Sequence, residues 1–501
     1  MSVRILPVIV ILFIWFAAPF ALGLEVHVPG DYPDIQAAAA ANGALPDTII
    51  LADGVHSGPG NSGIEFTLLT LRSASGDPEA CVIDPGGDVF GWLYSYPYSA
   101  DWSEIEGVGF RNSGGLRVYA SRVHFENCRF TDCEVGACHW QLGIDGWARY
   151  RVIDCVARNC RGVVSGAYSI VIAGCDVSGN DGTVFSAWEI DCRSSRFVGN
   201  GSSLSWTEMI ATFATDAPPF PGDGVYVDCE FRDNRYGSIL GIRVSLVSGC
   251  TFAYNQGNCV SAYAYSPDAS LSLLVENSTF AANGGREDQF DINADSGDSN
   301  AVVEIVNSLF AFRNAGGVYD SWSGIVPDVV SCCDVFGNDG GDWSGPLAPF
   351  QGQAGNLSED PLFCGLYAGE YTLYGISPCL PENNDCASLI GAWGQGCENP
   401  TGIETSPGFS GRLEQNRPNP FNPRTEIAFT LEVSARVSLE IFDAAGRLCR
   451  TLMTDRSCTA GRHSLSWDGR DDSGAELSSG VYFYKLEAGG VGESRKMIML
   501  R

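Results

Sequence analysis

The chain is short of basic residues, and lysine is missing altogether from residues 24–411. Over the whole sequence 30 Lys and Arg stand against 60 Asp and Glu, and most of the acidic excess falls within residues 24–411. Nucleic acids and anionic lipid surfaces are bound through basic patches, so this composition argues against both as partners. It is compatible with solubility outside the cell and with divalent cations such as Ca2+.

Apolar runs that approach the length of a bilayer crossing, about 20 residues, are missing after the N-terminus. There, Arg4 precedes an apolar run over residues 5–20, and Ala21-Leu22-Gly23 follows with small residues where a signal peptidase cleaves. We therefore expect residues 1–23 to be a signal peptide that is removed on export. The alternative is an uncleaved anchor helix, for which the run is short.

The central region also lacks helix-length amphipathic stretches and a leucine periodicity, which argues against a leucine-rich horseshoe. Instead one short pattern returns, as CEFRDN from Cys229, CTFAYN from Cys250 and STFAAN from Ser278. Aligned on the large apolar residue, ten positions fall in register at spacings of 20 to 34: Phe110, Phe130, Ala157, Val177, Phe197, Phe231, Phe252, Phe280, Phe310 and Val335. A period of this length predicts a solenoid in which these residues form an inward column.

Each repeat is expected to supply a short strand. A small residue stands two places before the apolar one, at the two-residue period of a strand. Asparagine recurs three places after it, at Asn180, Asn200, Asn234, Asn255, Asn283 and Asn338. Asparagine tolerates left-handed backbone angles and its amide can bond the equivalent backbone one coil away, so we expect it to turn the corner and form a ladder. Cys133 and Cys160 take this place in earlier coils, and Asn314 follows Phe310 one residue late.

Parallel strands without helices stack as a β-helix, and the chain resembles a family built in this way. The segments VPGDYPDIQAAAAAN from Val28 and DTIILADGVHSG from Asp47 are similar to the opening of right-handed parallel β-helix proteins of the pectate-lyase superfamily. DPLFCG from Asp360 and LIGAWGQGC from Leu389 resemble the closing coils of exported bacterial members. The resemblance implies an all-β right-handed parallel β-helix over residues 24–397. It implies no particular chemistry, because this fold carries lyases, hydrolases, esterases, adhesins and inert spikes.

The composition changes after Cys397 to a stretch rich in Pro, Gly, Ser and Asn, and residues 398–411 are expected to form a linker. Alternating stretches such as ARVSLEIFD and GVYFYKLEAG then predict a small β-sandwich over residues 412–501. These residues resemble the C-terminal sorting domain of type IX secretion cargo, related to the immunoglobulin-like domain of the flagellar hook cap. The matching pieces include NRPNPFNPRTEIAFTL from Asn416 and SLSWDGRDDSGAELSSGVYFYKL from Ser464.

The second resemblance implies the outer-membrane secretion machinery as a partner of residues 412–501. It also implies export through the periplasm to the medium or the bacterial cell surface. An accessory sandwich of the same type, in a bacterium without that secretion system, is the alternative.

Cysteine is plentiful, but the count of 19 is odd and several cysteines share one position of the repeat, which indicates packing as much as bridging. The candidates for disulfides lie elsewhere. One group follows the repeats, and a second pair flanks a turn of the sandwich: Cys364, Cys379, Cys386 and Cys397, then Cys449 and Cys458. Whether each group is oxidised stays open at this point.

Catalytic signatures of the fold are not recognisable in the sequence. The motifs of pectin esterases and the clustered aspartates of polygalacturonases are missing, and a lyase would need Arg or Lys as base beside carboxylates. The densest mixed-charge set offers weak catalytic candidates: Arg232, Asp233, Arg235 and Arg243. The alternative interpretation is a solvated coil surface with ordinary ion pairs.

An acidic insert over Glu287–Asn300 is expected to be a loop between coils, with Asp288, Asp291 and Asp295 as weak candidates for Ca2+ ligands. The insert lacks the regular spacing of a calcium loop, so a plain acidic loop is the alternative. No other cofactor is expected.

Aromatic residues alternate in FGWLYSYPYSADW, and in an extended chain Trp92, Tyr94, Tyr96 and Tyr98 would share one flat face. Such a face suits stacking on sugar rings, and we predict it as the glycan contact. The alternative is that these rings pack against a neighbouring coil.

Two classes of function follow from these features. The first is a secreted or cell-surface protein, expected to be a monomer, whose repetitive face binds glycan or another surface ligand. The second is a polysaccharide lyase or glycoside hydrolase whose site carries no familiar motif. The first is favoured because no catalytic constellation is recognisable.

Overall fold

The computed structural model describes residues 25–398 and 411–500 apart from a set of gaps. The gaps are residues 42–47, 67–69, 95–101, 120–121, 135–136, 140–147, 182–183, 202–209, 213–223, 236–237, 242–243, 265–270, 285–289, 297–300, 314–315, 322, 414, 432–434, 444–446, 459–460, 473 and 489–490.

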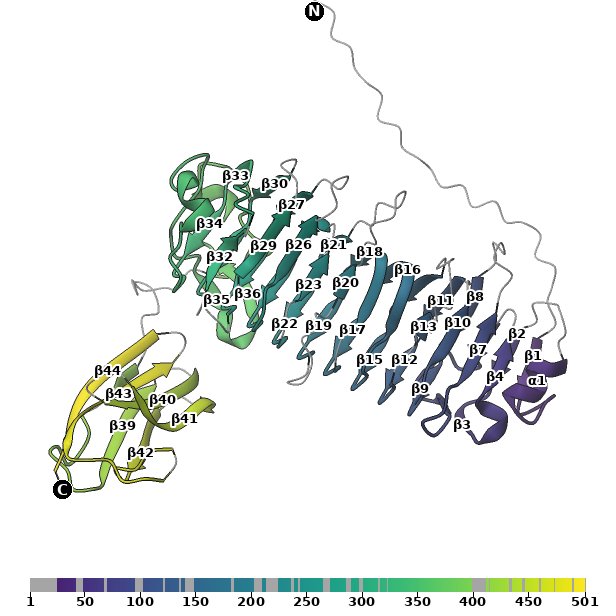
Figure 1. The fold of residues 1–501 in the computed structure, drawn as a ribbon, viewed down its shortest axis with the longest axis horizontal. Helices are drawn as coiled ribbons and strands as arrows, with labels where there is room; N and C mark the ends of the chain where they lie inside the picture. The colour runs from purple at the N-terminus through teal and green to yellow at the C-terminus, as the bar shows by residue number, and fades with distance from the viewer. Residues whose placement is uncertain are drawn as a thin grey trace, which may run out of the picture. The chain divides into compact units, whose positions relative to one another are not determined.

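A typical coil of the solenoid contains three strand segments, and equivalent segments of successive coils form three rows (Figure 1). The first row comprises β1 (Glu25–Val28), β2 (Thr48–Leu51), β5 (Thr70–Ser73), β8 (Trp102–Glu106), β11 (Arg122–Glu126), β14 (Arg149–Ile153), the second halves of β16 (Val164–Ala173) and β18 (Phe185–Arg193), β21 (Gly224–Val227), β24 (Val244–Ser248), β27 (Ser272–Glu276), β30 (Val302–Val306) and β33 (Val329–Ser331). The second row comprises β3 (Gly54–Ser57), β6 (Cys81–Asp84), β9 (Gly109–Arg111), β12 (Arg129–Thr131), β15 (Val156–Arg158), β17 (Asp176–Ser178), β19 (Arg196–Val198), β22 (Glu230–Arg232), β25 (Thr251–Ala253), β28 (Thr279–Ala281), β31 (Leu309–Ala311) and β34 (Asp334–Phe336). The third row comprises β4 (Ile64–Phe66), β7 (Gly91–Tyr94), β10 (Leu116–Tyr119), β13 (Ala137–His139), the first halves of β16 and β18, β20 (Ile210–Thr212), β23 (Ile239–Gly241), β26 (Val260–Ala264), β29 (Phe290–Ser296) and β32 (Gly317–Asp320).

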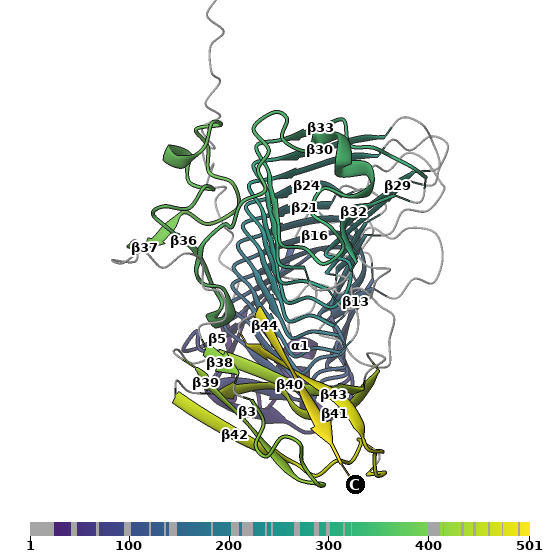
Figure 2. The ribbon, with the colours of Figure 1, turned by 90° about the vertical axis from the view of Figure 1, so that its left-hand side faces the viewer.

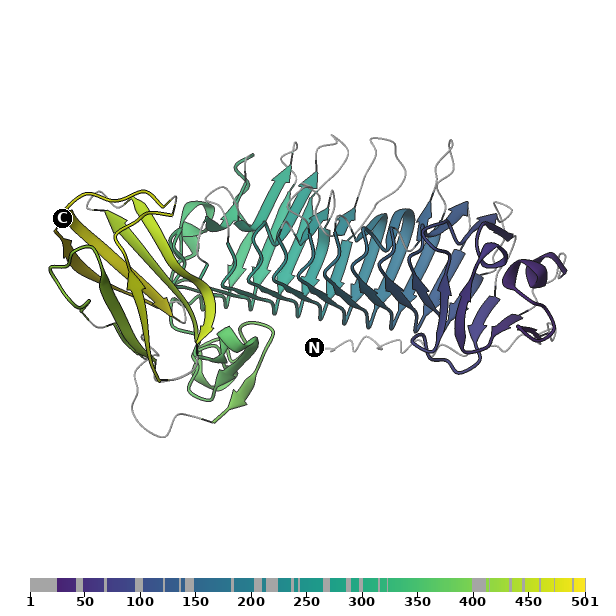
Figure 3. The same cartoon turned by 90° about the horizontal axis from the view of Figure 1, so that it is seen from below.

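Pairing within a row is parallel and runs from each coil to the next, as in β8 with β11 and β14, or β25 with β28 and β31 (Figure 3). Among the described residues the second row forms a sheet of 12 strands, and the other two rows belong to one sheet of 22 strands. The long strands β16 and β18 join those two rows, because their first halves pair with the third row and their second halves with the first. The prediction of a parallel β-helix is therefore confirmed.

Two compact units divide the chain, one of residues up to Glu230 with Asn234–Arg243, the other of Phe231–Asp233 with Val244–Arg501. The first holds the earlier coils. The second holds the later coils, the segment that closes them and the sandwich. The expected domain boundaries at residues 23, 397 and 411 remain predictions.

The ten registered apolar residues are all buried, as predicted. In the second unit the rings of Phe231, Phe252, Phe280 and Phe310 are stacked with neighbouring centroids 4.7 to 4.8 Å apart. The small residue two places earlier also points inward, but it lies in the bend before the strand, where its hydroxyl or thiol accepts an N–H from the neighbouring coil, as Ser278 does from Cys250. Burial of this column is the main stabilising term of each coil.

The asparagine ladder is confirmed, whereas the prediction that asparagine turns the corner is wrong. The amide of Asn180 donates to the carbonyl of Ala157, and the oxygen of Asn200 accepts the backbone N–H of Asn180. The left-handed backbone belongs to the preceding residue, as at Gly179 and Gly199. The ladder side chain is buried and bonded to the neighbouring coils, and the residue before it takes the left-handed conformation that turns the chain.

The first coil is covered by helix α1 (Ile35–Ala41), which buries Ile35 and Ala38. The carboxylate of Asp34 accepts the N–H of Ala37 at 2.8 Å, which satisfies a free donor of the first turn. The adjacent turn η1 (Pro59–Asn61) also holds α1 in place, since Asn61 accepts the N–H of Ile35. The described residues contain no helix that is both long and apolar enough to cross a membrane.

The last coil is followed by a closing segment, residues 357–397, which we define by its contacts with the outward side of the second row. It contains β35 (Phe363–Gly365), η3 (Leu366–Ala368), β36 (Glu370–Tyr374), η4 (Pro381–Asn383) and β37 (Gln395–Cys397), and η2 (Gly345–Phe350) precedes it. Leu309 and Ala311 pack with Leu373, Leu380 and Ile390 in one cluster. The Cys332–Cys386 disulfide attaches the segment to the last coil, Cys364–Cys397 links β35 to β37 within it, and Cys379 stays a buried thiol.

The C-terminal domain is an antiparallel sandwich, as predicted (Figure 2). One sheet has β38 (Gly411–Leu413), β39 (Thr425–Leu431) and β42 (Gly461–Trp467), and the other has β41 (Leu448–Cys458), β40 (Ala435–Asp443), β43 (Gly480–Ala488) and β44 (Val491–Met499). Trp467, Tyr484, Phe429 and Met497 fill its core. Cys449 and Cys458 are buried thiols and form no disulfide.

Candidate functional site

Aromatic and basic side chains gather at the start of the first-row strands in the first unit. Trp102, Arg122 and Arg149 are the first residues of β8, β11 and β14, and the strand register sets them side by side on successive coils. Tyr168 precedes Ser169, the residue that pairs with Arg149 on the next coil. We call Trp102, Arg122, Arg149, Arg151 and Tyr168 the arginine–aromatic corner.

The arginines of this corner stack on its rings. The guanidinium carbon of Arg151 lies 4.3 Å from the centre of the Trp102 ring, and that of Arg122 lies 6.0 Å from it. The guanidinium of Arg149 lies 5.5 Å from the centre of the Tyr168 ring. Cations over aromatic faces within about 6 Å are held by the ring quadrupole. Trp102 and Arg122 are half-buried, and Arg149 and Arg151 are exposed.

Neighbouring charges shape the electrostatics of the corner. Burial and the nearby carboxylate of Glu189 raise the pKa of Tyr168, so its hydroxyl stays protonated at neutral pH. The three arginines concentrate positive charge in a chain whose net charge is −30. An anionic group is therefore attracted to this corner more than to the acidic surface elsewhere.

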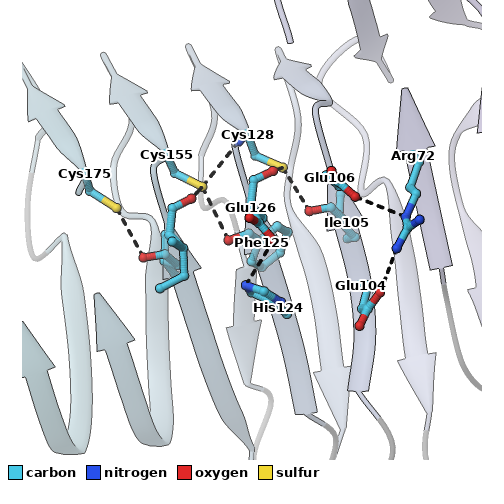
Figure 4. A network of polar contacts seen from close by, with 12 residues as sticks. Arg72, Glu104, Ile105, Glu106, His124, Phe125, Glu126, Cys128, Cys155 and Cys175 are labelled. Carbon is cyan, nitrogen blue, oxygen red and sulfur yellow. Dashed lines mark hydrogen bonds and ion pairs between the residues drawn. The ribbon is translucent and has the colours of Figure 1, made fainter. Parts of the chain in front are cut away.

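Charged side chains also lie on β5, β8 and β11 (Figure 4). Arg72 lies 3.3 Å from Glu104 and 3.1 Å from Glu106, and each of these side chains is nearly half exposed. His124 stands between Glu104 and Arg151 in the register, with its Nε2 atom 3.9 Å from Glu126. Figure 4 also shows Cys128, Cys155 and Cys175 in a column, and their burial places them in the interior.

The arrangement suits binding more than proton transfer. Glu104 and Glu106 both pair with Arg72, which engages both carboxylates. In contrast, Arg149 and Arg151 are exposed, and an exposed guanidinium can donate two parallel hydrogen bonds to a planar acid group. An acid group of a glycan would thus find exposed donors at this corner.

The predicted glycan face is only partly described. Trp92 lies on β7 and is half-buried, with its side chain directed away from the buried Leu93. It stands between Glu65 and Arg117 in the register. The backbone of Tyr94 ends the same strand, and Tyr96 and Tyr98 fall outside the described residues. The predicted glycan role of this set stays a prediction.

The weak catalytic candidates do not all fall in the described part of the chain. Arg232 ends β22 and forms an ion pair with Asp233 at 3.3 Å. A side chain added at Gly369 would approach the Arg232 guanidinium within 2.8 Å, so the closing segment covers Arg232. Arg235 is exposed, and Arg243 lies outside the described residues. The structure gives Arg232 a packing and pairing role, and the catalytic role of the set remains a prediction.

The expectation of an acidic loop over Glu287–Asn300 is wrong for its middle part. Phe290–Ser296 forms β29, and Asp291 is buried against Arg313 with an oxygen–nitrogen distance of 2.7 Å. Burial raises the pKa of Asp291, and the Arg313 charge opposes this shift. Asp288 lies outside the described residues, and Asp295 belongs to β29. The described residues contain no cluster of three or more His, Cys, Asp or Glu able to hold a metal ion.

Arg313 is a residue that the sequence analysis missed. It occupies the ladder position after Phe310, where Asn338 accepts its backbone N–H at 3.0 Å. The thiol of Cys259 donates to the same carboxylate of Asp291 at 3.4 Å. An arginine three places after Phe310, where other coils have asparagine, was the available signal.

Comparison with known families identifies one part of the chain. Residues 419–491 match the FlgD Ig-like domain, in agreement with the fold of the sandwich. No curated protein matches the chain.

Proposed function

We propose that this is an exported glycan-binding protein, with the arginine–aromatic corner as its glycan site. The observation that carries the proposal is the guanidinium of Arg151 held 4.3 Å above the Trp102 ring. Stacked arginine loses little entropy on meeting a ligand, because the ring already orders it. The preferred ligand is a glycan that carries acid groups.

The arginines alter one expectation drawn from the acidic composition. An acidic solenoid repels uronic-acid polymers unless Ca2+ bridges the charges, yet at this corner Arg122, Arg149 and Arg151 supply the positive charge themselves. Binding there is therefore metal-independent and weakens as salt is added.

The binding role is tested by screening the full chain against acidic and neutral polysaccharides and titrating the best ligand into two variants. Trp102→Ala and Arg151→Met each weaken binding about tenfold, while the thermal midpoint changes little. Trp393→Ala, which alters an exposed tryptophan of the closing segment, is the matched control and binds normally. Unaltered affinity in both corner variants contradicts the proposal.

The face predicted at Trp92 and Tyr94 is a separate contact and has its own test. Exchanging both for alanine is expected to weaken binding of neutral glycans several-fold and to leave the thermal midpoint almost unchanged. A large fall in stability with normal affinity would instead show that these rings serve packing.

Export is the second half of the proposal. The N-terminal pattern of residues 1–23 and the FlgD Ig-like match at residues 419–491 support a sorting role for the sandwich, with the outer-membrane secretion machinery as its partner. Deleting residues 412–501 should leave the solenoid folded in the periplasm of its native host. Continued appearance of the truncated protein in the medium would refute the sorting role.

The enzymatic alternative is distinguished by turnover. Incubating the protein with uronic-acid and neutral polysaccharides, with and without Ca2+, is expected to release no products. Cleavage that depends on Arg232 or Arg235 would replace the binding proposal with a lyase or hydrolase.

A further inference from the structure

A hollow lies at the bends that follow the second-row strands, apart from the arginine–aromatic corner. Asn112, Asp132 and Asn159 follow β9, β12 and β15 directly, and each has a left-handed backbone with φ between 50° and 55°. Successive coils repeat at about 4.8 Å, so the three side chains stand in a polar column at that spacing.

Glycines open a hollow beside this column. The wider bend after β6 contains Gly86 and Gly87, and both have left-handed backbones that only glycine adopts easily. Together with the column they line an open cavity of about 610 Å3, within the size range of small-ligand sites. On the other side of the column, Glu134 and Arg161 form an exposed ion pair at 3.8 Å.

Two of the groups that face this hollow, Asp132 and Asn159, are left for solvent or a ligand, whereas the amide of Asn112 donates to the carboxylate of Asp84. Neither the carboxylate of Asp132 nor the amide of Asn159 forms a hydrogen bond or ion pair with another described residue. The corresponding bend before the second row behaves differently, because there Asn127 donates its amide to the carbonyl of Gly76 at 2.7 Å. Asn127 therefore stabilises the fold at its bend, whereas Asp132 and Asn159 remain available at the other bend.

The mixture of groups selects the class of ligand. Asp132 accepts hydrogen bonds, Asn159 both donates and accepts, and Arg161 donates, while the Glu134–Arg161 pair is neutral as a whole. The single unpaired carboxylate disfavours an anion, and the described residues hold no metal-binding cluster. Hydroxyl groups both donate and accept, so a polyhydroxylated neutral molecule satisfies this set best.

We propose that the hollow is a second ligand site, which binds a short neutral saccharide across two or three coils. It shares with the proposed function only the class of ligand, and it uses none of the residues of the arginine–aromatic corner. The two sites would allow one glycan chain, or two, to bind along the same unit.

The test titrates cello-, xylo- and malto-oligosaccharides into the full chain by calorimetry. At least one series binds, and Asp132→Asn and Asn159→Gly each weaken it about tenfold. Both replacements tolerate the left-handed backbone, and Gly179 occupies the equivalent place on the next coil. Asp154→Asn, also at a left-handed position but outside the hollow, is the matched control and binds normally.

Failure of this site is distinguishable from failure of the proposed function. Trp102→Ala should leave binding of the neutral oligosaccharides unchanged. Asp132→Asn should leave binding of the acidic glycan unchanged. Equal affinity of Asp132→Asn and the unmodified chain for every oligosaccharide overturns the second site, as does an absence of binding. If Ca2+ alone releases heat on binding and Asp132→Asn abolishes that heat, the hollow is a cation site, and this outcome also overturns the saccharide proposal.

Discussion

The outward side of the second strand row differs between the earlier and the later coils, although the inward side carries the same apolar column. On the earlier coils it is half-buried to exposed and carries charged residues, with ion pairs between coils: Arg129–Glu79 at 2.8 Å, Arg158–Asp176 at 3.4 Å and Arg196–Glu230 at 2.7 Å. On β25, β28 and β31 every residue is buried. The outward positions of these strands are Thr251, Ala253, Thr279, Ala281, Leu309 and Ala311.

The closing segment explains the difference within the second unit. Its Trp393 donates from Nε1 to the hydroxyl of Thr251 at 2.7 Å, and the N–H of Ala392 donates to Thr279 at 2.9 Å. Gly391 fits there because a side chain would approach Thr279 within 2.8 Å. A strand row that is covered in this way needs small side chains and satisfied hydroxyls, whereas an uncovered row keeps charges that water solvates.

Breaking an ion pair in the later coils is accordingly expected to cost more free energy than breaking one in the earlier coils. Arg313 and Asp291 are each about 1% exposed, and Asp334 is fully buried next to the Cys379 thiol. Removing one partner of a buried pair leaves an unsolvated charge, while removing one partner of an exposed pair leaves a hydrated one. The comparison thus predicts large effects in the second unit and small effects in the first.

The largest effect is expected for Arg313→Ala. The change leaves Asp291 buried without its cation and lowers the free energy of unfolding by about 3 to 5 kcal/mol. Chemical denaturation measures it. The double variant Arg313→Met/Asp291→Leu removes both charges and should recover most of the loss. A single variant as stable as the unmodified chain would show that Asp291 is neutral and its pairing immaterial.

A second large effect concerns the carboxyl of Asp334 and its pH dependence. Burial raises its pKa to about 7, with the charges of Glu359 and Asp342 adding to the shift and hydrogen bonds from Glu359 N–H and Cys379 opposing it. The folded state therefore binds a proton that the unfolded state releases, and this group favours folding less as pH rises from about 4 to 7. The shift of about 3 units corresponds to at most about 4 kcal/mol.

The measurement compares unfolding free energies of the unmodified chain and Asp334→Asn between pH 4 and pH 8. The difference between them should grow in favour of the variant toward pH 8 and level off above about pH 7. A constant difference across this range would mean that Asp334 keeps the same charge throughout.

The disulfide between Cys332 and Cys386 is expected to contribute about 2 to 4 kcal/mol, because it closes a loop with a sequence separation of 54 residues. Replacing both cysteines by serine should lower the thermal midpoint and raise hydrogen exchange in the closing segment first. Cys449→Ser, a change of a buried thiol in the sandwich, controls for the loss of sulfur. An unchanged exchange pattern in residues 357–397 would show that packing alone fixes the segment.

The inward column was predictable from the sequence because burial demands a large apolar residue at one place of every coil, and ten repeats reinforce the signal. The ladder asparagines were also predictable, because they recur at one place of successive coils. The left-handed residue before them was not, since Gly179, Asp233, Tyr254 and Phe312 all occupy that position and share no side-chain property. There the stacked backbone imposes the conformation.

The candidate site was less predictable, because residues distant in sequence meet through strand register. In the sequence Trp102 ends an aromatic stretch, but in the structure its neighbours are Arg122 and Arg151 on the following coils. Connections of variable length between the third and first rows hide that register in the sequence. The closing segment shows the same limit, since Trp393 meets Thr251 across a separation of 142 residues.

The smallest effect is expected for the exposed pair Arg158–Asp176, whose side chains are 49% and 37% exposed. A double-mutant cycle with Arg158→Met and Asp176→Asn should give a coupling energy of about 0.2 to 1 kcal/mol, which falls further when salt is added. Arg196–Glu230, with a shorter contact and a less exposed carboxylate, should lie at the upper end of that range. A coupling above about 2 kcal/mol at either pair would mean that outward charges hold the earlier coils together, and the contrast with the covered coils would then disappear.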